Sequence, residues 1–118
     1  MADAGLFVGW GIPVRGREAK SLEVFNESVQ YWGQLQQDGK IEDFELALLT
    51  PHGGDLSGFA LLRGSEEQIA ALRNEDDFLR LTTRANLIVE RFGVVQAFLG
   101  EALGTQMATF QEQVSELT

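Results

Sequence analysis

The sequence predicts an α+β fold, in which a four-stranded antiparallel sheet carries helices on one face. The 118 residues are the usual length of one domain, so a single domain over 1–118 is expected. A hydrophobic content of 44% supplies apolar material for one core. The apolar spacing changes along the chain between every second residue, typical of strands, and three- and four-residue steps, typical of helices. Together these observations indicate an α+β domain.

The first two elements are a strand and a helix. The strand is expected at 6–12, where large apolar residues fill every second position, and Pro13 ends it. The helix is expected at about 18–38, with Gly39 following it as the C′ residue. Its apolar stripe consists of Leu22, Phe25, Val29, Trp32 and Leu35.

The next two elements form a hairpin. Strands are expected at 41–50 and 56–64, with Thr50 opposite Leu56 across a short loop. This register places one almost wholly apolar face under the helices: Phe44, Leu46, Leu48, Thr50, Leu56, Gly58, Ala60 and Leu62. The other face is mixed: Asp43, Glu45, Ala47, Leu49, Ser57, Phe59, Leu61 and Arg63. A slip of one residue would exchange the two faces, so the register is testable.

The second half of the chain supplies two helical pieces, a strand and a last helix. Ser65 is expected to cap a helix that ends near Asn74, with Gln68 at the capping-box position. A second helical piece is expected from about 75 to 90, and a strand at 94–99. A C-terminal helix is marked by Met107, Phe110, Val114 and Leu117. The resulting order, β-α-β-β-α-β-α, is that of the split βαβ, or ferredoxin-like, fold.

Charge and composition narrow the class of function. The formal net charge of −9 disfavours nucleic acid and anionic lipid surfaces as partners, because both are bound through clustered Lys and Arg. The chain has no cysteine, which excludes disulfides, thiolate metal sites and a cysteine nucleophile. No apolar run reaches the roughly 20 residues that span a bilayer, and the N-terminus lacks a signal-peptide pattern. A cytoplasmic protein without a membrane association is expected.

The chain's only histidine, His52, lies in the Gly-rich loop of the hairpin. One interpretation is structural: Gly53 and Gly54 supply positive φ, and Asp55 hydrogen-bonds locally. His52 is then exposed at the tip of a turn. The other interpretation makes His52 an acid or base at a pocket mouth, because histidine titrates near neutrality. A metal site is not expected, since one histidine without cysteine does not supply several converging ligands.

Two further groups of residues carry alternative interpretations. Gly9 and Gly11 flank Trp10 in the expected first strand, where they mark a close backbone approach or leave room for a ligand. A small basic group at the start of the first helix forms either a solvated loop or an anion site. It consists of Arg15, Arg17 and Lys20.

Five segments of the chain resemble a known group of proteins. They are GWGIP near the first strand, GRE at the first helix, GKIEDFE in the second strand, HGGDLSGF in the hairpin and GVVQAFLG in the last strand. From about Gly5 to Gly104 the chain is similar to the dimeric α/β-barrel group of ferredoxin-like proteins, and within it to small bacterial members of unassigned function. The resemblance implies two subunits whose sheets meet face to face in a shared barrel, with a cavity between sheet and helices or within the barrel.

The same group includes cofactor-independent monooxygenases, haem proteins, and dehydratases or isomerases of small organic molecules. Its haem members use a histidine on a helix, whereas His52 lies in a hairpin loop, which argues against haem ligation. No cofactor is expected. The residues independently favour a homodimer. The mixed face of the sheet holds Leu49, Phe59 and Leu61, which Phe7 joins, and such a patch needs a cover. A second copy related by a two-fold axis provides one.

Two functions remain open at this point. The first is a homodimeric module without chemistry of its own, either structural or binding a small organic molecule, since no acid–base or metal constellation is visible. The second is a cofactor-independent enzyme of the oxygenase, isomerase or dehydratase type. Its catalytic residues would be His52 as acid or base and Arg63 as an anion clamp.

The remaining candidates are ligand-binding residues. Glu45 or Gln96 would position polar groups of the ligand, and Phe59 and Trp10 would contact its apolar part. The enzyme hypothesis requires at least two of the polar candidates to converge on one pocket. In the structural alternative, Arg63 faces Asp43 and Glu45 as a cross-strand ion pair.

Overall fold

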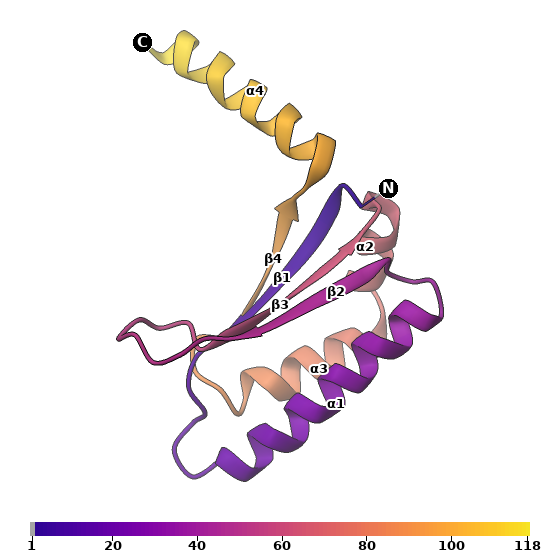
Figure 1. Ribbon diagram of the computed structural model, residues 1–118, viewed down its shortest axis with the longest axis vertical. Coiled ribbons are helices and arrows are strands. Elements are labelled where there is room, and N and C mark those ends of the chain that lie inside the picture. Colours follow the sequence, from indigo (N-terminus) through magenta and orange to yellow (C-terminus); the bar gives the residue numbers. More distant parts are fainter. Residues whose placement is uncertain (1) are drawn as a thin grey trace.

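The computed structural model describes residues 2–118. Four strands form one sheet, and three of the four helices pack together with it (Figure 1). The elements in chain order are β1 (Ala4–Trp10), α1 (Glu18–Gln37), β2 (Asp43–Leu48), β3 (Gly58–Gly64), α2 (Glu66–Arg73), α3 (Asp76–Asn86), β4 (Gly93–Phe98) and α4 (Gly100–Leu117). No helix in this part of the chain is both long and apolar enough to cross a bilayer. The α+β, ferredoxin-like order predicted from the sequence is confirmed.

The sheet has the strand order β2-β3-β1-β4, and every neighbouring pair is antiparallel. Phe44 pairs with Leu62 and Leu48 with Gly58, which is the register predicted for the hairpin. The ladder stops at Leu48, so Thr50 and Leu56 lie beyond it in the connecting loop. Each strand therefore directs alternate residues toward the helices or toward the open side of the sheet.

The core lies between the sheet and helices α1, α2 and α3. Its most deeply buried side chains are Leu6, Ile41, Leu62 and Leu72. Two members of the predicted apolar face depart from this pattern, because Thr50 is exposed in the loop and Leu48 is 69% exposed. Leu48 lies at the end of β2, where it borders a cavity instead of filling the core.

The two predicted helix signals around the hairpin are confirmed. Gly39 follows α1 with φ of +75°, a left-handed conformation that glycine adopts without steric cost. The Ser65 hydroxyl accepts a hydrogen bond from the Gln68 N–H at 3.1 Å, and the Gln68 side chain accepts one from the Ser65 N–H at 2.8 Å. This reciprocal pair is a complete capping box at the start of α2.

The expected helix to residue 90 was wrong, because α3 ends at Asn86. Residues 88–90 instead run antiparallel to the segment that follows β1. The Gly11 N–H donates to the Glu90 carbonyl at 2.7 Å, and the Val14 N–H donates to the Ile88 carbonyl at 2.8 Å. Backbone pairing between two distant segments thus overrides the local helical spacing. We call the paired segments 11–14 and 88–90 the backbone clamp.

The last helix differs from the other three. α4 begins at Gly100, before Met107, the first of the apolar residues from which the helix was predicted. None of its residues is buried. It leaves the end of β4 and projects away from α1 and α3 (Figure 1). The fold therefore consists of a packed βαββαβ body and an exposed C-terminal arm.

A polar contact ties α1 to the junction between α2 and α3. The Tyr31 hydroxyl donates a hydrogen bond to Oε1 of Glu75 at 3.3 Å, and Lys40 Nζ lies 3.0 Å from Oε2 of the same carboxylate. Burial, followed by the negative charge of Glu75, raises the pKa of Tyr31 above its ordinary value of 10.0. The contact thereby makes ionisation of Tyr31 more costly in the folded state.

We expect the burial of Tyr31, together with its contact to Glu75, to make stability fall in alkaline solution. The raised pKa stabilises the folded state fully below pH 10.0, and this contribution is lost as the pH rises through the folded-state value. Tyr31 is the chain's one tyrosine, so tyrosinate absorbance reports it alone. The midpoint of an absorbance titration should be higher in native protein than in guanidinium chloride. Equal midpoints would contradict the burial of Tyr31 and its contact with Glu75, and Tyr31→Phe should lack this part of the alkaline stability loss.

Candidate functional site

A cavity of about 250 Å³ lies between the helix-facing side of the sheet and helices α1 and α3. It is placed at the end of the sheet where β1 and β2 finish. Aromatic and aliphatic side chains dominate its lining. The lining residues are Val8, Trp10, Gly11, Pro13, Ser21, Leu22, Val24, Phe25, Ser28, Trp32, Leu48, Ser57, Phe78, Leu81, Thr82, Ala85, Ile88, Val89 and Phe92.

Aromatic rings set the shape of this cavity. Trp10, at the end of β1, meets the ring of Phe25 on α1 edge to face, with 5.9 Å between the ring centroids. Trp32 lies two helical turns further along α1, and its ring is tilted against that of Phe44 with 6.0 Å between the ring centroids. Such packing fixes flat apolar walls on two sides. The chain's two tryptophans both line the cavity.

The few polar groups on the helical walls are already hydrogen-bonded within their own helices. The hydroxyls of Ser21, Ser28 and Thr82 donate to the carbonyls of Glu18, Val24 and Leu79, respectively. The lining contains no Asp, Glu, His, Lys, Arg or Tyr side chain. Within residues 2–118, no cluster of three acidic, histidine or cysteine residues could hold a metal ion. The cavity is therefore suited to hold an apolar molecule.

The backbone clamp forms one border of the cavity. Gly11, Pro13, Ile88 and Val89 belong both to the clamp and to the lining. A Cβ atom on Gly11 would lie 2.7 Å from the Glu90 carbonyl oxygen and 2.9 Å from that of Asp55. The close backbone approach predicted at this glycine is therefore present, and the same residue lines the space available to a ligand.

Among the residues predicted to form a site, Trp10 lines the cavity and the others lie elsewhere. Phe59 is on the open side of the sheet, where its ring stacks on Phe7 with 5.2 Å between centroids. Gln96 is on the helix-facing side of β4 but borders a separate pocket beside α2. Neither residue lies in the same site as Trp10.

Arg63 forms the cross-strand ion pairs predicted as its structural alternative. Its Nη2 lies 2.6 Å from Oε1 of Glu45, and its Nη1 lies 3.3 Å from Oδ1 of Asp43. Hydrogen bonds to Glu45 and then to Asp43 raise the pKa of the Arg63 guanidinium. Two carboxylates thus hold the cation on the open side of the sheet. A role for Arg63 as an anion clamp stays a prediction.

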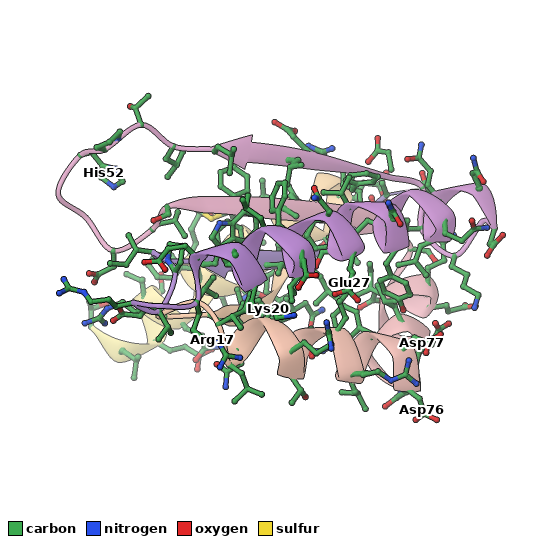
Figure 2. All side chains as sticks on the ribbon, turned by 90° about the horizontal axis from the view of Figure 1, so that it is seen from below. Arg17, Lys20, Glu27, His52, Asp76 and Asp77 are labelled. Atoms are coloured by element: carbon green, nitrogen blue, oxygen red, sulfur yellow. The ribbon has the colours of Figure 1, made fainter. Side chains whose placement is uncertain are left out.

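His52 lies in the exposed loop between β2 and β3, as Figure 2 shows. Its Nδ1 is 3.0 Å from the carbonyl oxygen of Thr50. Gly53 has φ of +84°, as expected for a Gly-rich turn, but the positive φ predicted for Gly54 is absent. Of the polar candidates, the structure joins Arg63 and Glu45 and brings His52 to neither. An acid or base role for His52 stays a prediction.

The basic group at the start of α1 is exposed to solvent, and Figure 2 shows Arg17 and Lys20 there. Lys20 Nζ pairs with Oε2 of Glu23, one helical turn along, at 2.9 Å. This ion pair favours the solvated interpretation of the group.

Most of the residues that line the cavity were not predicted from the sequence to form a site. Phe25 and Ser28 on α1, and Thr82 and Ala85 on α3, line it without belonging to a recognisable motif. The available signal was the apolar spacing on the two helices, interrupted on the core side by small residues. Such a stripe predicts a buried face but not a gap beneath it.

Comparisons with known proteins bear on the fold. No family model and no curated protein sequence matches the chain. Several solved structures are similar to it, among them those of three bacterial proteins.

The first is a dimeric protein of unknown function with a ferredoxin-like fold from Bacteroides fragilis, with 12% identity, a TM-score of 0.58, and coverage of 82% of this chain and 97% of that one. The second is SnoaB, a cofactor-independent oxygenase from Streptomyces nogalater, with 16% identity, a TM-score of 0.53, and coverage of 84% and 93%. The third is a putative antibiotic biosynthesis monooxygenase from Chloroflexus aurantiacus, with 9% identity, a TM-score of 0.52, and coverage of 82% and 93%. These similarities establish the ferredoxin-like fold.

The clamp at the cavity border yields a paired mutational prediction. Gly11→Ala should lower the free energy of unfolding by about 1–3 kcal/mol, because two backbone carbonyls must move to admit the methyl group. Gly33→Ala in α1 should instead stabilise by about 0.5–1 kcal/mol, since alanine is the better helix former. The added Cβ at Gly33 meets nothing within 4 Å. Urea denaturation of both variants measures the difference, and a Gly11→Ala variant as stable as the wild type would contradict the clamp.

Proposed function

We propose that the protein is a homodimeric α/β barrel in which each copy binds a small apolar organic molecule in the cavity. The observation that supports this most directly is the cavity of about 250 Å³, lined by aromatic and aliphatic side chains. Small-molecule sites are concave and mainly apolar, with few polar groups. The hydroxyls on the helical walls are engaged with backbone carbonyls, so shape and dispersion contacts select the ligand.

The lining favours binding over the alternative of a cofactor-independent enzyme. General acid–base catalysis needs a titratable group within hydrogen-bonding distance of the reacting atoms. The residues lining the cavity include no such side chain. The oxygenases among the similar structures have 9–16% identity to this chain, and their activity is a property of those proteins. The function we propose is therefore the binding of a small apolar molecule in the cytoplasm, a reducing compartment that suits a chain without cysteine.

The homodimer is supported by the open side of the sheet. Its centre is apolar, with Phe7 stacked on Phe59 and with Leu61 and Val95 directly opposite Phe7 on the flanking strands. Val95 is 57% exposed in one copy of the chain. An apolar sheet face that helices do not cover is stabilised by an isologous contact with a second copy. The similar protein from Bacteroides fragilis is dimeric.

Intrinsic fluorescence tests the ligand proposal, because both tryptophans line the cavity. Iodobenzene, a small apolar heavy-atom quencher, should quench them with a saturable dependence on its concentration. Aqueous iodide at the same concentrations should quench them less, since it is excluded from an apolar space. Quenching by iodobenzene that stays linear, without saturation, would overturn the proposed binding site.

A matched pair of variants locates this binding in the cavity. The Thr82 and Thr83 hydroxyls both donate to the Leu79 carbonyl, but Thr82 lines the cavity whereas Thr83 is exposed. Thr82→Phe should weaken iodobenzene binding by about tenfold or more, since extra bulk in an occupied space costs about 1–3 kcal/mol. Thr83→Phe should leave it unchanged. Equal affinities for the two variants would place the ligand elsewhere.

A second pair tests the dimer. Val95→Glu introduces a charge at the centre of the open side and should raise the dimer dissociation constant by about thirtyfold or more. Leu79→Glu is its control, since Leu79 on α3 is 51% exposed but belongs to the helix layer. Sedimentation equilibrium measures both. A wild-type protein that stays monomeric at every concentration would overturn the homodimer.

A further inference from the structure

The exposed helix α4 carries an apolar stripe that the body of the protein does not cover. Its five large apolar residues follow one another at alternating steps of four and three positions, which places them on one side of the helix. They are between 47% and 84% exposed. We call this set the α4 stripe: Leu103, Met107, Phe110, Val114 and Leu117.

The dimensions of the chain show that one copy leaves more surface exposed than a closed domain does. Its radius of gyration is 16.1 Å. A compact domain of this length has about 13.5 Å. Its accessible surface is 7734 Å². A monomeric protein of this mass exposes about 6,300 Å². The excess of about 1,400 Å² is larger than the roughly 800 Å² that each partner buries in a standard interface.

The charge of α4 decides which class of partner suits the stripe. The helix carries Glu101, Glu112 and Glu116, and the sequence has no Lys or Arg after Arg91. Helices that lie on membranes present Lys and Arg to anionic headgroups, so a lipid surface is disfavoured. An apolar protein surface remains as the partner.

The start of α4 is continuous with the open side of the sheet. The Leu99 N–H donates to the Asp3 carbonyl at 3.0 Å, which fixes the end of β4 beside the start of β1. The Leu99 Cδ1 atom lies 2.9 Å from the place of a Cβ on Gly5, a residue of the open side. From there α4 extends away from α1 and α3 (Figure 1). The arm and the open side thus border one another.

We propose that α4 is a dimerisation arm whose stripe packs against the second copy of the chain. This inference rests on the proposed homodimer and adds to it a second contact region outside the paired sheets. The second copy is brought close to α4 by the open side that borders it. The five-residue stripe covers about two heptads, fewer than the three or four that an independent coiled coil needs, so the sheets anchor the arm.

Two double variants with the same added charge test the arm. Met107→Glu with Phe110→Glu places both charges on the stripe. Thr105→Glu with Ala108→Glu places them on the opposite side of the same exposed helix. The stripe variant should raise the dimer dissociation constant by about thirtyfold or more, and the control variant should change it little. Circular dichroism of both variants should show unchanged helix content.

The outcomes separate this inference from the function on which it rests. A monomeric wild-type protein would overturn the homodimer and the arm together. A dimeric wild-type protein whose stripe variant dissociates no more readily than the control variant would overturn the arm alone. Loss of dimer in the stripe variant, with the control variant intact, supports the arm.

Spin labels give a second readout, because the chain has no native cysteine to interfere. A label on Val114→Cys should be immobilised in the dimer, whereas one on Glu112→Cys, on the opposite side of α4, should stay mobile. Equal mobility at both positions would overturn the arm. Immobilisation at position 114 in a monomeric protein would place α4 against its own sheet and would also overturn it.

Discussion

The rest of the structure depends on one constraint, which is that successive side chains of the central strand β1 point to opposite faces of the sheet. β1 pairs with β3 on one side and with β4 on the other, so its alternation propagates to both neighbours. Leu6 and Val8 are directed to the helices and are buried, whereas Phe7 between them is directed to the open side. One sheet thereby acquires an apolar face and a second, mixed face with an apolar centre, and α1, α2 and α3 cover only the first. The cavity lies on the first face and the proposed dimer contact on the second.

Local signals and strand alternation made much of this fold predictable from the sequence. The hairpin register followed from the alternation of apolar and polar residues in two strands, because a one-residue slip would bury Asp43 and Arg63. The capping box at Ser65 and Gln68 is a local signal, so it was visible without any tertiary information. The end of α3 was not predictable in this way, since it depends on backbone pairing with residues about 75 positions earlier in the chain.

The candidate site was harder to predict, for a different physical reason. His52 and Arg63 were candidates because their side chains are chemically distinctive. The loop between β2 and β3 holds His52 outside the cavity, and β3 directs Arg63 away from it. The cavity is built from common core residues. Phe25 and Ala85 would have the same sequence spacing in a helix packed without a gap. A void is a property of how α1 and α3 fit over the sheet, and apolar spacing carries no information about that fit.

The backbone clamp has a consequence for the local stability of the cavity border. Its hydrogen bonds join irregular segments, and the main sheet ladder does not include them. Local opening of such segments requires less free energy than global unfolding, so the clamp can release while β1, β3 and β4 stay paired. Amide hydrogen exchange at Gly11, Val14 and Glu90 then measures this local opening at one border of the cavity, separately from the stability of the sheet.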